Sequence, residues 1–112
     1  MSNGEEELER ALVKLRAKYL ADLPQRLADV GAELAKAESG DIPAMQTVRL
    51  LLHRLAGSAG NYGFDLATTR ARAAEDLAAR IAQTGTPPTA EQAASLRGLI
   101  ADLGAAFRPT GS

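Results

Sequence analysis

His53 is the only histidine in this chain of 112 residues, and it is the side chain whose chemistry is most distinctive. It lies in the stretch LLHRLAGSAGNYGF, residues 51–64, where Gly57, Gly60 and Gly63 follow it. The neutral nitrogen of an imidazole is a competent nucleophile at physiological pH and can accept a phosphoryl group. Phosphoryl transfer mainly requires positioning and charge neutralisation. The sequence therefore indicates a reactive histidine on a glycine-rich segment.

Other kinds of site are excluded or disfavoured by the residues present. With no cysteine and one histidine, the chain cannot form disulfides, thiolate metal sites or multi-histidine metal sites by itself. Ser58, the nearest hydroxyl in sequence, is rotated about 140° away from His53 on a helix, which argues against a hydrolytic triad. The segment GSAGNYG lacks the Lys and Ser or Thr of a nucleotide-binding loop. No carboxylate lies beside His53 on its own helix, so a docked partner would have to supply a metal and further catalytic groups.

Charge and hydropathy favour a soluble, cytoplasmic protein that binds neither nucleic acid nor membranes. The net charge is −1, from 13 basic and 14 acidic residues, which gives no overall field for polyanions. The charges of TTRARAAEDLAAR, residues 68–80, are most simply a solvated helix face. No apolar run approaches the roughly 18 residues of a membrane helix, and the acidic start MSNGEEELER is unlike a signal peptide.

Five helices are predicted to position His53, and no segment has the pattern of a strand. They span residues 5–22, 22–40, 43–62, 66–83 and 89–107. Because Pro24 is best tolerated in a first turn, we expect a break near Asp22, with Asp22 capping the second helix. Asp65 is the expected cap of the fourth helix, and TGTPPT separates the last two.

The expected fold class is all-α, an antiparallel up-and-down four-helix bundle with an additional N-terminal helix packed across one end. Residues 1–112 form one domain, in which residues 1–4 and 108–112 are expected to be flexible tails.

A turn of about 100° per residue places His53 at the centre of the exposed face of its helix. The expected buried face is formed by Ala44, Val48, Leu51, Leu55 and Tyr62. Gln46, Arg49, Ala56, Gly57 and Gly60 lie on the same side as His53.

Two glycines after His53 weaken this helix, at a cost of roughly 1 kcal/mol each relative to alanine. In one alternative the helix ends at Ala56, with Gly57 just past its end. We favour a helix that continues to Gly63, because Ala59 and Tyr62 stay in phase with the apolar face. Glycines on the exposed side would then let a partner come close.

The segment HRLAGSAGNYGF resembles a histidine phosphotransfer (HPt) domain, the intermediate carrier of multistep bacterial phosphorelays. In this resemblance His53 is the phosphorylated histidine, and Gly57, Ser58 and Gly63 match the residues that follow it. The resemblance extends from about Leu8 to Leu103 and implies a four-helix bundle with an accessory N-terminal helix. It implies that His53 takes a phosphoryl group from the aspartyl phosphate of one receiver domain and passes it to the aspartate of another.

The resemblance also implies the partners and the surroundings of His53. The partners would be response-regulator receiver domains and the receiver domain of a hybrid histidine kinase. The carrier itself, expected to be a monomer, would need no cofactor and have no kinase or hydrolase activity of its own, with Mg²⁺ held by the receiver. Gln46, Arg49, Gly57 and Gly60 would form part of the docking surface.

One position departs from the family pattern, which often has a lysine three residues after the histidine where this chain has Ala56. Arg49, or less well Arg54, could steady the phosphate instead, although either can equally be a solvated surface charge.

Two other functions stay open. A non-catalytic helical adaptor would bind receiver or kinase domains without phosphorylation. A histidine kinase fragment fits less well, because an acidic residue follows the histidine there, whereas Arg54 follows it here.

Overall fold

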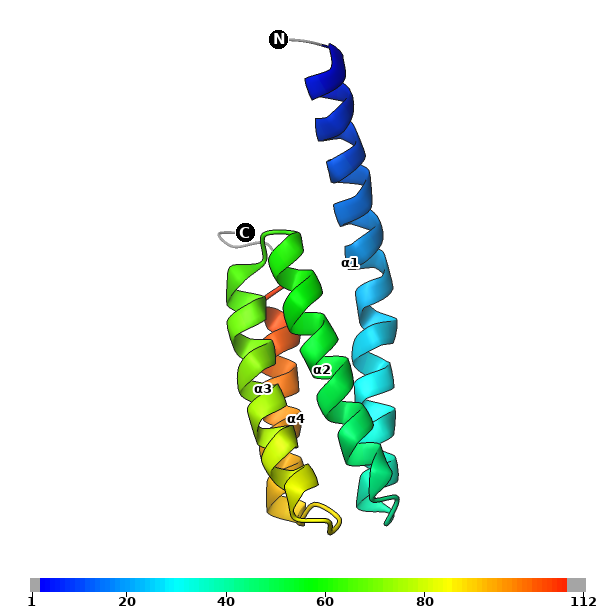
Figure 1. Cartoon of the computed structure of the whole chain (residues 1–112), viewed down its shortest axis with the longest axis vertical. Helices are drawn as coiled ribbons and strands as arrows, with labels where there is room; N and C mark the ends of the chain where they lie inside the picture. Colours follow the sequence, from blue (N-terminus) through cyan, green and yellow to red (C-terminus); the bar gives the residue numbers. More distant parts are fainter. Residues whose placement is uncertain (1–2, 109–112) are drawn as a thin grey trace.

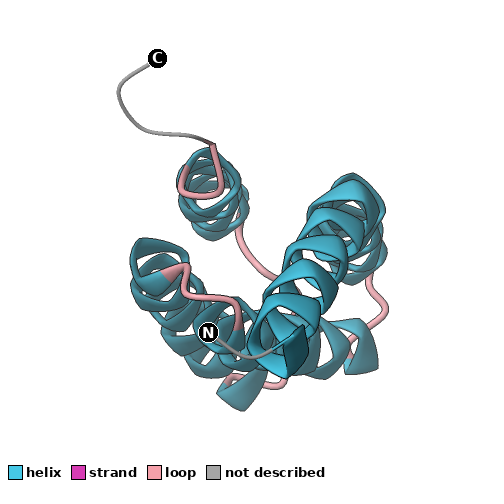
Figure 2. Cartoon of the chain, turned by 90° about the horizontal axis from the view of Figure 1, so that it is seen from above, coloured by secondary structure: helices cyan, strands magenta, loops and turns pink. Residues whose placement is uncertain are grey.

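The computed structural model describes residues 3–108 as an up-and-down bundle of four helices, with no strand in that range (Figure 1). The helices are α1 (Asn3–Glu38), α2 (Pro43–Asn61), α3 (Asp65–Gln83) and α4 (Ala90–Ala105). Each packs against two neighbours, so that the order around the core is α1, α2, α3, α4 (Figure 2). The predicted all-α bundle is confirmed.

Two glycines make the turns that reverse the chain. Gly40 and Gly63 have positive φ angles of 106° and 83°, which favour glycine. At the second turn, the Phe64 amide donates to the Ala59 carbonyl at 2.9 Å and the Gly63 amide to the Gly60 carbonyl at 3.1 Å. These two bonds are a Schellman motif, which satisfies carbonyls at the end of α2. Gly63 therefore ends the helix as predicted, and Gly57 and Gly60 lie inside it.

The predicted break near Asp22 is wrong, because α1 runs without interruption through Pro24. Asp22 therefore caps no helix, and its carboxylate pairs with Lys18 at 3.4 Å. A proline inside a helix costs about 3 kcal/mol. Packing offsets that cost, because the buried side chains before and after the proline lie on one stripe. They are Tyr19, Leu23, Val30, Leu34 and Ala37.

The first four turns of α1 do not pack across the end of the bundle, as the sequence had led us to expect. They project beyond α2, α3 and α4 (Figure 1), and residues 3–18 are all exposed. The 36-residue helix accounts for the 57 Å length of the molecule. It begins at Asn3, within the tail predicted for residues 1–4, while residues 1–2 and 109–112 of the predicted tails lie outside the described residues.

The other helix ends follow the sequence closely. Thr89 caps α4 in a capping box: its hydroxyl accepts from the Gln92 amide at 3.1 Å, and the Gln92 side chain accepts from the Thr89 amide at 2.9 Å. The prediction that Asp65 caps α3 is wrong, because Asp65 is already the first helical residue. Phe64 occupies the cap position without a side-chain bond.

All four aromatic residues of the chain meet at the end of the bundle from which α1 projects. The Tyr19 ring stacks on Tyr62 with a centroid separation of 4.7 Å, and Phe64 lies 5.2 Å from Phe107. The Tyr19 hydroxyl shares a 2.8 Å hydrogen bond with Ser58. This cluster fixes α1 against the C-terminal end of α2, and it occupies the Ser58 hydroxyl on the side away from His53.

Small residues form the contact between α2 and α3. Ala67, Ala71, Ala74 and Ala78 of α3 are fully buried. A Cβ added at Gly60 would lie 3.3 Å from the Thr68 hydroxyl, and that hydroxyl donates to the Ala56 carbonyl at 3.0 Å. The two helices therefore approach closely, which brings side chains at the edges of α2 within reach of α3.

None of the helices within residues 3–108 combines the length and the apolar character needed to cross a bilayer.

Candidate functional site

His53 lies at the edge of α2 that faces α3, and not at the centre of the exposed face. Leu52 and Ala59 are fully buried and Ala56 is 3% exposed, whereas Leu51 is only partly buried. The observed buried face of α2 is therefore rotated around the helix axis, toward α3, relative to the buried face predicted from the sequence. The centre of the observed face lies roughly 120° from His53 at 100° per residue. The His53 side chain is still 66% exposed, so a partner can reach it.

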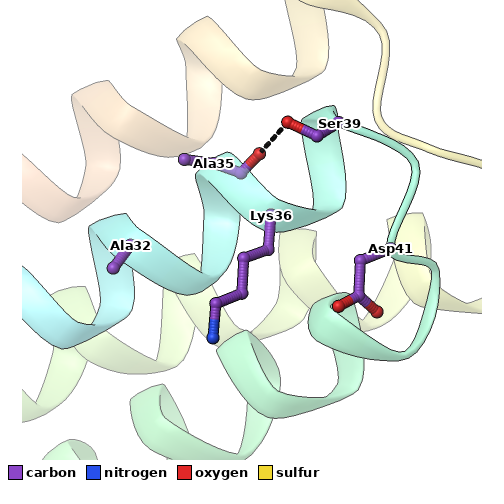
Figure 3. Close-up of a pocket in the computed structure, with 5 residues that line it drawn as sticks. All are labelled: Ala32, Ala35, Lys36, Ser39 and Asp41. Atoms are coloured by element: carbon purple, nitrogen blue, oxygen red, sulfur yellow. Dashed lines mark hydrogen bonds between the residues drawn. The ribbon is translucent and has the colours of Figure 1, made fainter.

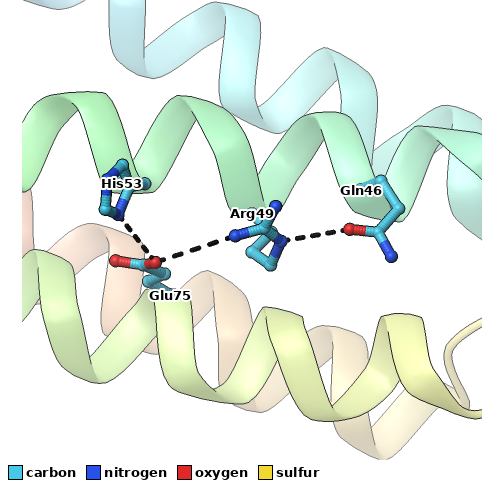
Figure 4. A network of polar contacts seen from close by, with 4 residues as sticks. All are labelled: Gln46, Arg49, His53 and Glu75. Carbon is cyan, nitrogen blue, oxygen red and sulfur yellow. Dashed lines mark hydrogen bonds and ion pairs between the residues drawn. The ribbon is translucent and has the colours of Figure 1, made fainter.

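Glu75 of α3 lies beside His53 (Figure 4). Its Oε2 is 3.0 Å from the imidazole Nδ1, and its side chain is only 18% exposed. Because an ionised carboxylate only accepts hydrogen bonds, Nδ1 is the protonated nitrogen of this pair. The Nε2 of a neutral ring then keeps its lone pair, so it is the nitrogen of this ring that could act as a nucleophile.

Arg49 and Gln46 extend the network along the same face of α2 (Figure 4). The Arg49 Nε donates to Gln46 Oε1 at 3.0 Å, and its Nη1 is 4.0 Å from the Oε2 of Glu75. The guanidinium group is thus held one helical turn before His53. Its side chain is 38% exposed, so it is accessible to an anion bound at this face.

Two further predicted site residues, Gly57 and Arg54, differ in their surroundings. Gly57 is exposed, and among residues 3–108 nothing lies within 4 Å of the position that a Cβ would take. Arg54 points to the other side of α2, where it lines a shallow pocket with Arg26 and Asp29 of α1.

Two positions differ from what the sequence had suggested. The prediction that Ala56 belongs to the surface around His53 is wrong, because its buried side chain cannot form part of a docking surface. Gly60 is exposed, and its missing side chain also serves the contact of α2 with Thr68.

Sequence reasoning missed Glu75, whose charge we had assigned to a solvated face. One signal was available: Glu75 adjoins the apolar stripe of α3, four residues after Ala71 and three before Ala78. Pairing it with His53 also requires the axial register of two antiparallel helices. The Schellman turn at Gly63 and the contact of Gly60 with Thr68 set that register.

Other polar clusters offer no competing site. Figure 3 shows a pocket near the end of α1 lined by Ala32, Ala35, Lys36, Ser39 and Asp41. The Ser39 hydroxyl donates to the Ala35 carbonyl, and Lys36 pairs with Glu33 at 2.9 Å, so two of the pocket's three polar side chains are engaged within the helix. Nowhere in residues 3–108 do three or more acidic, histidine or cysteine side chains gather as a metal site would require.

Glu38, a carboxyl group with a shifted pKa, lies apart from His53. A hydrogen bond from Arg97 of α4 lowers the pKa of Glu38, at the last residue of α1. The same bond raises the pKa of Arg97. This pair ties two helices together at the surface and has a structural role.

Comparison with known proteins identifies one family. A family model described as Hpt domain matches residues 14–106, which is most of the chain and includes His53 and Glu75. Comparison with curated proteins and with solved structures gave no match.

Proposed function

The chain belongs to the Hpt domain family, and on this premise we propose that it is a phosphoryl carrier between receiver-domain aspartates, with His53 as the phosphoacceptor. The observation that supports this most directly is the geometry of one side chain. The imidazole is 66% exposed, its Nδ1 is bonded to Glu75, and its Nε2 is left as the reactive nitrogen.

The chemical step moves one phosphoryl group and leaves the Nδ1 proton in place. The Nε2 lone pair attacks the phosphorus of an aspartyl phosphate, the Nε2–P bond forms, and the acyl O–P bond breaks to release the partner's carboxylate. The phosphorylated ring, still protonated at Nδ1, carries a positive charge next to the Glu75 carboxylate. Glu75 therefore orients the ring and stabilises its charge, much as a carboxylate does for the histidine of a hydrolytic triad. Transfer to the next aspartate is the reverse reaction.

Arg49 is our proposed substitute for the lysine that is missing at Ala56. It lies on the face that carries His53, and its hydrogen bond to Gln46 and its ion pair with Glu75 hold the guanidinium near the ring. Arg54 lies toward α1. We expect Arg49→Ala to slow phosphotransfer more than Arg54→Ala, measured side by side, and equal effects would contradict this assignment.

The face around His53 suits a docking partner. Gly57 lies one turn after His53 beside open space, so the surface of a receiver can approach the backbone of α2 there. The receiver would supply Mg²⁺ and the aspartyl phosphate. The partners proposed are receiver domains of response regulators and of a hybrid histidine kinase, in the cytoplasm of a bacterium.

Phosphotransfer itself tests the proposal. Each receiver from the source cell is phosphorylated with labelled phosphate, purified from its kinase and mixed with this protein. We expect an acid-labile, alkali-stable label on the wild type and none on His53→Gln, which removes the only imidazole of the chain. Arg54→Gln is a control that leaves His53 intact. Binding without transfer would instead establish the adaptor function, and label on His53→Gln would exclude His53 as acceptor.

A further inference from the structure

The projecting part of α1 exposes a leucine stripe that continues the stripe of the core. Leu8, Leu12 and Leu15 are 60%, 52% and 50% exposed, and their spacing of four and three residues continues to buried Tyr19. Beyond Tyr19 the same stripe is covered by the bundle. At Leu8, Leu12 and Leu15 it is left uncovered by the rest of residues 3–108, so it is open to contact with a partner.

The charges that flank this stripe reverse sign along the helix. Glu5, Glu6, Glu7 and Glu9 precede Arg10, Lys14, Arg16 and Lys18. At about 100° per residue, Glu9 and Arg16 lie on one edge of the stripe, and Ala11 and Lys18 lie on the other. The edge with Glu9 and Arg16 is therefore acidic toward the N-terminus and basic toward the bundle.

We propose that residues 3–18 pair with the same segment of a second copy, as an antiparallel two-helix coiled coil with two-fold symmetry. In such a pair the same edge of the two helices comes together, and the two edges run in opposite directions. Leu12 of one copy packs against Leu15 of the other, and Glu9 of one copy lies beside Arg16 of the other. Leu8 then reaches the bundle end of the second copy, where Leu20 and Leu66 are also exposed.

A parallel pair fits the same segment poorly. In that arrangement one edge of the stripe faces the opposite edge of the stripe on the other copy. Arg16 of one copy then lies beside Ala11 of the other, and no acidic residue lies opposite it. The charge order thus selects the antiparallel partner, and only a second copy is guaranteed to carry the complementary order.

The proposed dimer leaves His53 free, because that side chain contacts Glu75 of α3, whereas the proposed interface is formed by residues 3–18 of α1. Dimerisation is thus independent of the phosphotransfer proposal. It differs from the monomer that the sequence had suggested.

The mass in solution tests the proposal. Light scattering after size exclusion should give a dimer for the wild type at micromolar concentration. Leu12→Glu should raise the dissociation constant by about 100-fold or more, since each dimer contains two substitutions. The control Val13→Glu introduces the same charge at a position that is 68% exposed and lies off the stripe, so it should remain a dimer. Circular dichroism confirms that both variants stay helical, and both should retain wild-type phosphotransfer.

Two further measurements test the orientation. Glu9→Arg should weaken the dimer, and adding Arg16→Glu should restore it. Because the chain has no cysteine, Leu12→Cys and Leu15→Cys proteins can also be mixed under oxidising conditions. Antiparallel pairing predicts disulfides mainly between the two different variants, whereas disulfides within each variant would indicate a parallel pair and overturn the proposal. A wild-type protein that stays monomeric at about 100 μM, or a Val13→Glu variant that dissociates as Leu12→Glu does, would also overturn it.

Discussion

Replacing Glu75 tests the role of the carboxylate beside His53. Glu75→Ala removes the acceptor of the Nδ1 proton and the charge that balances the phosphorylated ring. Glu75→Gln keeps an acceptor oxygen but removes the charge. The two variants together separate orientation of the ring from stabilisation of its charge.

The expected magnitude follows from the exposure of the pair. A hydrogen bond to a charged group contributes about 1.5–3 kcal/mol. Here the imidazole is 66% exposed and the carboxylate 18%, so water screens part of that interaction. We therefore expect about 1 kcal/mol, in line with exposed ion pairs, which is about a fivefold slower transfer. The loss of the nucleophile in His53→Gln should abolish transfer.

The assay follows phosphotransfer from a purified phosphorylated receiver by rapid quenching, and nitrogen NMR reports which imidazole nitrogen carries the proton. In the wild type we expect the proton on Nδ1. In Glu75→Ala the preference should weaken and transfer should slow, whereas Glu75→Gln should slow transfer while keeping the Nδ1 proton. The control is Asp76→Asn, which alters the charge of α3 equally at an exposed neighbouring position. Wild-type transfer and an unchanged proton position in Glu75→Ala would refute the reasoning.

Three further predictions concern α2, α1 and the surface ion pair. Gly57→Gln should raise stability by about 0.5–1 kcal/mol in urea unfolding, because its side chain enters open space, yet slow transfer; unchanged transfer would exclude close approach of a partner there. Pro24→Ala should raise the free energy of unfolding by about 2–3 kcal/mol by restoring a helical hydrogen bond, and an equal or lower value would contradict our account of α1. Arg97→Gln should lower the unfolding midpoint at pH 7. Because the Arg97 bond lowers the pKa of Glu38, its contribution is complete above the ordinary glutamate pKa and is lost as the pH falls through the lowered pKa. The difference between wild type and variant should therefore disappear once the pH is below the lowered pKa of Glu38, and a difference that persists in acid would mean that Arg97 acts in another way.

Local patterns in the sequence were sufficient for most of the secondary structure. The ends of α2 and α4 follow from glycine, proline and capping residues that act within one or two turns, as at Gly63 and Thr89. The reactive residue could be proposed for a similar reason, since the chain contains one histidine and a characteristic glycine pattern after it.

Pro24 marks the limit of local reasoning about the helices. The conformational preference of proline favours a helix start at Pro24. The apolar stripe from Tyr19 to Ala37, however, stabilises the fold more by packing as one continuous surface. That gain depends on the presence of α2 and α4, which a local window of sequence does not contain.

The surroundings of His53 mark the same limit for the site. The sequence by itself determined that His53 lies in a helix, on a side with little bulk. Only the tertiary structure decided that the buried face of α2 turns toward α3 and that Glu75, 22 residues away, bonds to the ring. The physical reason is that the rotation and the register of two packed helices depend on how closely small residues such as Ala56 and Gly60 allow them to approach. That distance is a property of the pair and not of either helix alone.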